Sequence, residues 1–164
     1  MMGFPDTIRF AYGKTLSGVL TKSESWDKIV RVITKGHRAY ADKAESTNAP
    51  NILGGATDNK GKEARNILCR TMLTLDYDSL DEGFEPDDMA FALDMLGYAA
   101  VAYSTFSHKT ERAEGKSRLR VIVPLSDEIE PRAYPAAVRA FTNELGIECS
   151  PESYIVAQIM VLPS

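Results

Sequence analysis

The amino-acid sequence predicts an α/β (α+β) fold in which helices pack on a β-sheet. Short apolar runs that end at proline, glycine or aspartate are typical of strands. They alternate with segments whose apolar residues recur at i, i+3 and i+4, as in amphipathic helices. The 164 residues match the size of one domain, and 44% apolar residues are enough for a core. We therefore expect a single domain over residues 1–164.

Five apolar segments are predicted to be strands. Pro124 is expected to end one of them, because proline cannot donate a hydrogen bond to a neighbouring strand. A stretch rich in Asn, Gly, Asp and Pro over residues 48–62 is predicted to be a long loop. The predicted strands are residues 7–12, 67–77, 99–103, 119–123 and 157–162.

The predicted helices are marked by capping residues and by proline or glycine at their ends. The first follows Ser23 or Ser25, either of which can cap it. Proline fits the first turn of a helix and glycine its end, which places one helix from Pro86 to Gly97 and another from Pro131 to Gly146. A further helical piece is expected around residues 40–41. The apolar stripe of the first helix consists of Trp26, Ile29, Val30 and Ile33.

The charged residues are unevenly distributed. A net charge of −4 and a pI near 5.2 argue against a broad basic surface for nucleic acid. Nevertheless, five bases and only two acids lie between residues 109 and 120, and acids concentrate between residues 76 and 88. An acidic patch near basic clusters suits a metal ion together with phosphate groups. A second basic cluster consists of Lys60, Lys62, Arg65 and Arg70.

Other features indicate a cytoplasmic protein without membrane contact. Cys69 and Cys149 are far apart in the sequence and are expected to be two buried, reduced thiols. His37, in a helical context, is expected to be a surface or packing residue. No apolar run reaches the ~20 residues of a transmembrane helix, and the first residues lack the layout of a signal peptide.

Asp76 and Asp78 form the most informative pattern. They lie two residues apart on a predicted strand, so their side chains point to the same face. Two adjacent carboxylates repel unless a cation lies between them, and oxygen ligands at this spacing suit Mg²⁺ or Mn²⁺. Many nucleotidyl-transfer enzymes hold two metal ions with such a pair. The alternative is a strand that runs into an acidic loop.

Two further segments supply donors for phosphate oxygens. Ser107, His108 and Lys109 follow a predicted strand, and strand ends are where sites in α/β folds cluster. Arg118 and Arg120 share one face of another strand and are costly there unless they meet anions. The alternatives are an exposed loop histidine and an edge strand with solvated arginines.

In this order, these elements resemble the archaeo-eukaryotic primase superfamily, in its phage, prophage and plasmid primase-polymerase branch. Members carry an acidic pair at a strand end, then a Ser/Thr-rich motif with a histidine, then a strand with arginine before Pro-Leu, and a last segment that contains a third acid. The resemblance implies an RRM-like primase-polymerase core, with a mixed sheet flanked by helices. The matching segments are residues 70–78, 103–108, 118–125 and 158–164, and residues 52–55 resemble the family's glycine-containing loop.

The resemblance also implies a role for each site residue. Asp76 and Asp78 would bind Mg²⁺ or Mn²⁺ and would be catalytic together with His108, which contacts the triphosphate. The family builds or extends primers from nucleoside triphosphates on a single-stranded DNA template and usually precedes a helicase domain. The chain is therefore expected to be the N-terminal part of a longer replication protein. The implied nucleotide-binding residues are Ser107, His108, Lys109, Arg118 and Arg120, with Arg70 as a further candidate.

Two positions depart from the family's pattern. The third acid belongs four residues before an aromatic residue, and counting back from Tyr154 that position is Ser150. The arginine expected eight residues later is Gln158, while Glu148 and Glu152 lie nearby but out of register. Three hypotheses stay open: a template-dependent nucleotidyltransferase of the DNA primase and polymerase type, a catalytically degraded domain that binds nucleotide or single strands, and a metal-dependent nuclease.

Overall fold

The computed structural model describes residues 5–15, 18–35 and 49–163. The piece expected around residues 40–41, and His37, lie outside this part of the chain. None of the described helices is long and apolar enough to span a membrane. The strands are β1 (Ile8–Thr15), β2 (Gly18–Glu24), β3 (Asn51–Leu53), β4 (Gly55–Thr57), β5 (Ile67–Leu80), β6 (Val101–Ser104), β7 (Ser117–Ile129) and β8 (Met160–Val161), and the α-helices are α1 (Trp26–Thr34), α2 (Pro86–Met95) and α3 (Tyr134–Leu145).

The strands form two four-stranded sheets, in the orders β2-β1-β3-β8 and β4-β5-β7-β6. Together with the helices they confirm the predicted α+β class. The expected mixed sheet is corrected in one respect, because every pairing among the described strands is antiparallel. β5 and β6 run in the same direction, yet β7 lies between them and pairs with both. This is the split β-α-β arrangement, with α2 as the crossover.

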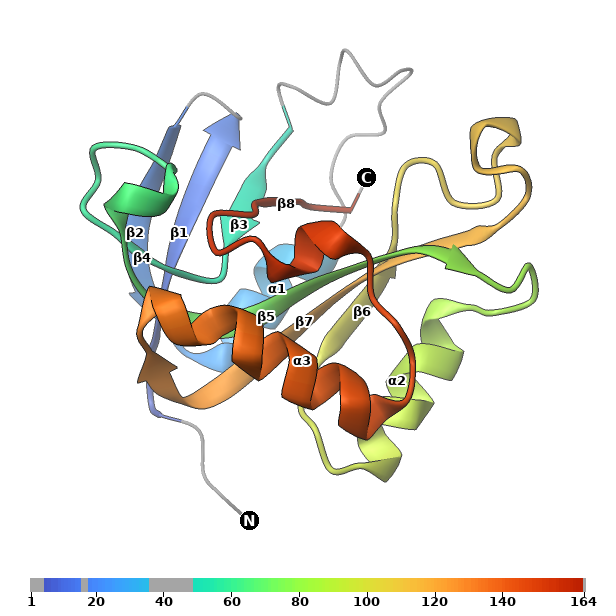
Figure 1. Cartoon of the computed structure of the whole chain (residues 1–164). Coiled ribbons are helices and arrows are strands. Elements are labelled where there is room, and N and C mark those ends of the chain that lie inside the picture. The colour runs from blue at the N-terminus through green and yellow to red at the C-terminus, as the bar shows by residue number, and fades with distance from the viewer. Residues whose placement is uncertain (1–4, 16–17, 36–48, 164) are drawn as a thin grey trace.

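The second sheet is covered on both faces (Figure 1). One face packs against α2 and α3, with Leu75 and Phe141 in the core. The other face packs against α1 and the first sheet, with Ile33 and Met72 in the core. β5 and β7 are therefore held between two apolar layers, which fixes the position of the polar residues at their ends.

Most helix ends lie where the sequence predicts them, but α3 begins at Tyr134, because Pro131–Ala133 form a 3-10 turn before it. α1 begins directly after Ser25, although the Ser25 side chain makes no capping hydrogen bond. α2 begins at the predicted proline, and the side chains of Glu85 and Asp88 close its first turn reciprocally. Gly97 and Gly146, which follow α2 and α3, have φ of 77° and 72°. This left-handed conformation suits glycine and ends a helix.

The long loop predicted over residues 48–62 is wrong in part, because β3 and β4 lie within it. Gly54 carries the chain from one sheet to the other, and its carbonyl accepts the N–H of Met72 at 3.1 Å. A Cβ on Gly55 would lie 2.2 Å from the Cys69 carbonyl oxygen. These glycines therefore permit a close approach of strands and do not mark a loop.

Several predicted strand boundaries also differ; β1 and β5, for example, run on to Thr15 and Leu80. β7 does not end at Pro124 but runs on to Ile129, and the register with β5 shifts next to this proline, where a missing N–H is tolerated. The strand predicted over residues 157–162 is shortened to β8, because the Gln158 N–H closes a turn onto the Ile155 carbonyl at 3.0 Å. β2 was not predicted, since only one of its seven residues is buried and no alternation results.

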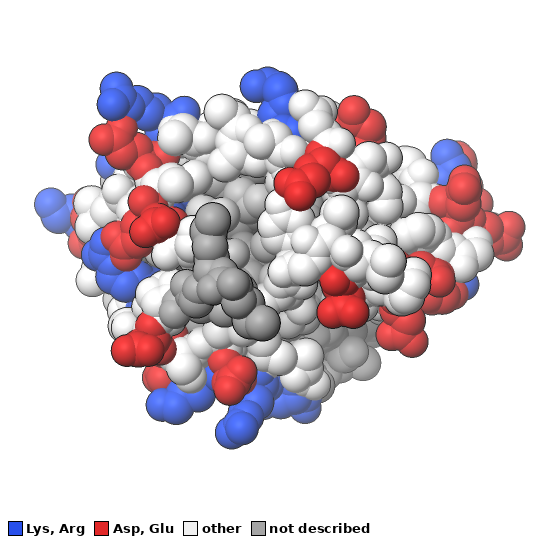
Figure 2. Space-filling view, turned by 90° about the horizontal axis from the view of Figure 1, so that it is seen from below, with Lys and Arg blue, Asp and Glu red and all other residues white. Residues whose placement is uncertain are grey.

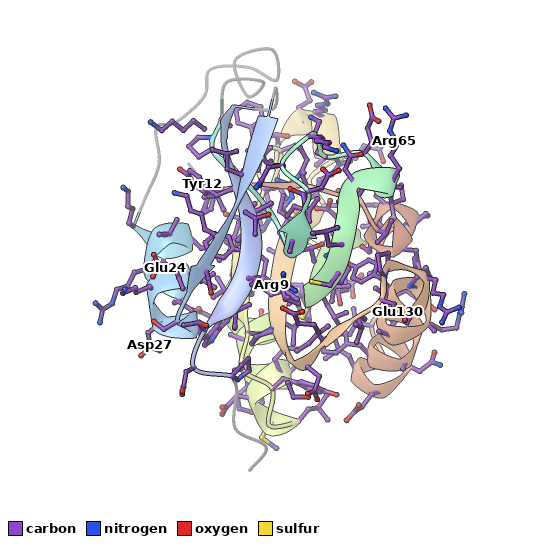
Figure 3. All side chains as sticks on the ribbon, turned by 90° about the vertical axis from the view of Figure 1, so that its left-hand side faces the viewer. Arg9, Tyr12, Glu24, Asp27, Arg65 and Glu130 are labelled. Atoms are coloured by element: carbon purple, nitrogen blue, oxygen red, sulfur yellow. The ribbon has the colours of Figure 1, made fainter. Side chains whose placement is uncertain are left out.

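Arg9 connects the first sheet to the second (Figure 3). From β1, its Nε donates to Glu128 Oε1 on β7 at 2.6 Å, and its guanidinium donates to the Cys69 sulfur on β5 at 3.4 Å. The hydrogen bond from Arg9 holds the pKa of Glu128 below its usual value. Cys69 and Cys149 are both buried and unpaired, which confirms the prediction for the two thiols.

Gly55→Ala is expected to destabilise the fold, because the added Cβ would meet a backbone carbonyl that cannot move without separating β4 from β5. Overpacking of this kind costs about 1–3 kcal/mol or more. Thermal denaturation should therefore show a lower Tm. Gly83→Ala is the control, since a Cβ there has nothing within 4 Å. Equal Tm values for the two variants would contradict the close contact.

Candidate functional site

The ends of β5, β6 and β7 border a cavity of about 270 Å³ that gathers carboxylates, arginines and hydroxyls. Asp76, Arg120 and Tyr103 are register partners on these three adjacent strands, so their side chains form one row on the same face. The charged residues in the wall are Asp76, Asp78, Glu152, Arg112, Arg118 and Arg120.

Asp76 is the most enclosed of the acids, with its side chain 13% exposed. Arg120 Nε donates to its Oδ1 at 2.9 Å, and Gln158 Nε2 donates to its Oδ2 at 2.8 Å. Burial raises the pKa of Asp76, and the charge of Arg120 opposes that shift. For Arg120, burial is the largest single influence and favours the neutral form, but Asp76, Tyr103 and Asp78 together raise the pKa of Arg120 above its usual value. The pair is therefore a charged contact in a partly desolvated place.

Asp78 is more open, with 43% of its side chain exposed. The Ser150 hydroxyl donates to Asp78 Oδ2 at 3.2 Å, and an Arg118 nitrogen lies 3.9 Å from Oδ1. Ser150, the residue that stands where the family's third acid is expected, thus lies directly against the acidic pair. Within the described chain, no three His, Cys, Asp or Glu side chains form a group that could hold a metal ion.

The segment that contains Ser150 and Ser153 makes hydrogen bonds to the backbone of β5 beside the acidic pair. The Asp76 N–H donates to Ser153 Oγ at 2.9 Å, and the Asp76 carbonyl accepts the Ser150 N–H at 2.7 Å. The Asp78 N–H donates to Ser150 Oγ at 3.1 Å. Ser150 and Ser153 therefore fix the strand that presents both carboxylates.

The predicted donors divide into two groups. Ser107, Arg118 and Arg120 line the cavity with the acidic pair, whereas His108 and Lys109 are not in its wall. Both of these contact Glu85 at the start of α2: Lys109 forms an ion pair with it, and His108 Nε2 lies 3.4 Å from Oε2. His108 Nδ1 accepts the backbone N–H of Arg118 at 3.1 Å, so in this structure His108 positions the strand that carries Arg118.

Arg70 is a core residue, which corrects its expected place among the phosphate-binding candidates. Its side chain is fully buried and donates to the carbonyls of Val156 and Met72 at 2.6 and 3.0 Å, and to Thr74 Oγ1 at 2.7 Å. The guanidinium lies 3.8 Å above the Tyr134 ring. Burial lowers the pKa of Arg70. The residue anchors the segment that leads to Gln158.

The sequence did not single out Arg112 and Thr105 as parts of the cavity wall. Both lie in the predicted donor-rich region, and the run of bases over residues 109–120 was the only signal for Arg112. The Thr105 hydroxyl and Arg118 Nε are buried and have no hydrogen-bond partner among the described residues. Buried donors without an acceptor carry an energetic cost unless a ligand supplies one.

Ser153→Ala should lower stability, because it removes a buried hydroxyl that accepts the Asp76 N–H. Such a loss costs about 1–3 kcal/mol, which corresponds to a Tm decrease of roughly 2–4 °C per kcal/mol. Ser79→Ala on the exposed part of the same strand is the control. Differential scanning fluorimetry would argue against the cap if both variants melted like the parent.

The chain is similar to one protein family and to one solved structure. A family model described as the VapE N-terminal domain matches residues 21–164. A solved structure, the AEP domain of the primase-polymerase of cyanophage S-2L, is 11% identical, with 96% of this chain and 72% of that chain covered and a TM-score of 0.46. No curated protein matches the chain. The family agrees with the phage and plasmid replication domain that the motifs predicted. Because the match covers most of the sequence, the chain belongs to the family of VapE N-terminal domains.

Proposed function

We propose that this domain is a metal-dependent nucleotidyltransferase of the DNA primase and polymerase type. The observation that carries the proposal is the meeting of Asp76 and Asp78 with three arginines in one cavity wall. Carboxylates suit a divalent cation, and arginines suit phosphate oxygens. A nucleoside triphosphate with its Mg²⁺ or Mn²⁺ presents both partners at once.

The acidic pair fits one divalent cation. Each carboxylate oxygen has two acceptor positions, so the single hydrogen bond to each oxygen of Asp76 leaves one position free. Asp78 is half-exposed, and the Arg118 nitrogen near its Oδ1 is 3.9 Å away. When bound, the cation would offset the charge of the nucleotide's phosphates. A second cation would lack its carboxylate at Ser150.

The phosphates would be held by Arg118, Arg120 and Arg112, with Ser107 and Thr105 as hydroxyl donors. Two buried donors in this wall, Arg118 Nε and the Thr105 hydroxyl, lack acceptors, and phosphate oxygens supply them. His108 and Lys109 are proposed second contacts. They reach a phosphate only when their contact with Glu85 opens.

In the proposed reaction, the 3′-oxygen of a DNA primer forms a bond to the α-phosphorus. The bond from that phosphorus to the bridging oxygen breaks, pyrophosphate leaves with the electron pair, and the hydroxyl proton passes to water. Arg118 and Arg120 would offset the charge that builds on the pyrophosphate. The partners would be a single-stranded DNA template and, in a longer replication protein of the cytoplasm, a helicase domain.

A second candidate function is nucleotide binding without turnover. Gln158 and Arg120 both bind Asp76, and Ser150 occupies the place of a third acid beside Asp78. A neutral hydroxyl offsets no positive charge, so the cation that activates the primer hydroxyl suffers most. We therefore expect nucleotide binding to outlast catalysis, with weak activity that favours Mn²⁺ over Mg²⁺.

Asp76→Asn combined with Asp78→Asn should abolish Mn²⁺-dependent dNTP binding while the fold persists, because the amides cannot compensate a cation. Isothermal titration calorimetry with dATP and Mn²⁺ measures the loss, and circular dichroism reports the fold. Asp81→Asn with Asp127→Asn makes the same change of net charge at exposed positions. Unchanged affinity in the first variant would place the metal site elsewhere.

In the Ser150→Asp variant, the stability of the fold should depend on a bound metal ion. In the metal-free protein the new carboxylate would stand beside Asp78 Oδ2. Like charges 4 Å apart repel by about 4 kcal/mol near a protein surface, and exposure of Asp78 reduces this, so we expect a loss of roughly 1–3 kcal/mol. Mn²⁺ should raise the Tm of this variant more than that of the parent.

Primer extension with labelled dNTPs and NTPs, single-stranded template and Mn²⁺ should increase in Ser150→Asp, and more so with Gln158→Arg. Ser150→Asn, similar in size but neutral, is the control and should show neither effect. Full Mg²⁺-dependent activity in the parent, with no gain in Ser150→Asp, would mean that a glutamate serves as the third ligand. Strand cleavage without incorporation would indicate a nuclease.

A further inference from the structure

A second hollow lies on the opposite side of the sheet from the first cavity and shares no lining residue with it. It is a groove of about 800 Å³ between the end of α2 and the side of α3. Its floor is apolar, with Leu73 from β5 and Val123 from β7, and Tyr98 and Phe141 pack edge to face at 5.0 Å in its wall. Ala137 and Ala140 on α3 leave the groove open.

The outer face of α2 is apolar where a solvent-exposed helix is usually polar. Phe91 is 68% exposed and Met95 is 70% exposed. They are four residues apart and share the face opposite the buried Met89 and Leu93. This face borders the groove through Asp94, which lines it. Exposed apolar patches of this kind mark interaction sites.

The charge of this region has one sign. The sequence has no lysine or arginine between Arg70 and Lys109, while six acids lie between residues 81 and 94. Among the described residues that line the groove, the charged ones are Asp94 and Glu144. Seen from below, the molecule has a white centre with separate acidic side chains, and basic side chains lie at the periphery (Figure 2). Nucleic acid is repelled from such a surface.

We infer that the groove and the outer face of α2 form a docking surface for an amphipathic helix with basic flanks, contributed by a protein partner. Apolar side chains of that helix would fill the floor above Leu73 and Val123, and its Lys and Arg residues would meet Asp94 and Glu144. The pairing of β7 with β6 ends at Ile122, and beyond it Pro124 has no N–H to donate to an added strand. A helix that lies between α2 and α3 is therefore favoured over a strand. The inference does not depend on the proposed nucleotidyl transfer.

The test uses the full chain and a fluorescein-labelled peptide of roughly 18 Leu and Lys residues, arranged so that a helix of about five turns has one apolar face. A second peptide carries Glu in place of every Lys. Fluorescence anisotropy should show binding of the Leu/Lys peptide that weakens with salt, and no binding of the Leu/Glu peptide.

Two pairs of variants decide where the peptide binds. Ala140→Trp fills the groove and should weaken binding at least about tenfold, whereas Ala136→Trp changes an exposed residue of the same helix outside the groove and should leave binding unchanged. Phe91→Ser with Met95→Ser should weaken binding in the same way, and Leu20→Ser with Leu68→Ser, at exposed apolar positions elsewhere, should not.

Three results would overturn the inference. The first is equal affinity of Ala140→Trp and Ala136→Trp for the Leu/Lys peptide. The second is failure of the parent to bind that peptide, or a preference for the Leu/Glu peptide. The third is a parent dimer in analytical ultracentrifugation that Ala140→Trp converts to a monomer, because the occupant would then be a second copy of this chain.

Discussion

The open edge of β5 is the constraint on which the candidate site depends. β4 covers only the first residues of β5, so no other described strand pairs with the backbone from Thr74 to Asp78 on that side. Backbone groups left unpaired in a buried place cost free energy comparable to a lost hydrogen bond. The Tyr134 hydroxyl contacts the N–H and C=O of Thr74, and segment 150–153 does the same for the backbone of Asp76 and Asp78. Hydroxyl groups, together with the Ser150 N–H, thus make the hydrogen bonds that a neighbouring strand would make.

The open edge of β5 explains why the segment from Ser150 to Gln158 belongs to the candidate site. A segment that caps β5 must lie beside the residues that β5 presents, so Ser150 and Gln158 come into contact with Asp78 and Asp76. Arg70 also holds this segment, by donating a hydrogen bond to the Val156 carbonyl. Changes that loosen the cap therefore act on the carboxylates, and changes to the carboxylates act on the cap.

The sequence predicted the parts of the site that lie on regular strands. Asp76, Asp78, Arg118 and Arg120 were placed by strand periodicity, which depends only on neighbours along the chain. The role of Ser150 as a backbone cap was not predictable, because it depends on which edge of β5 is uncovered.

The predictions that were wrong also involve contacts between residues that are distant in the sequence. Gly54 and Gly55 were read as loop residues because glycine breaks local structure, yet here they allow β3 and β4 to approach β5. Arg70 was a further phosphate-binding candidate only because it lies in a segment that resembles the primase family. Its burial against Tyr134 depends on contacts distant in sequence. The role of His108 at the triphosphate stays a prediction; its contact with Glu85 could not be predicted, because Glu85 lies outside the motif.

The charge balance of the first cavity couples the binding of the two ligands proposed for it, the triphosphate and the cation. Its wall carries three acids and three arginines, and the departures at Ser150 and Gln158 remove one acid and one base relative to the resembled family, which leaves that balance unchanged. A triphosphate brought alone to this wall would meet the arginines but also the carboxylates of Asp76 and Asp78. A cation brought alone would compete with Arg120 for Asp76. Each ligand removes the repulsion that opposes the other, so their affinities must rise together by the same factor.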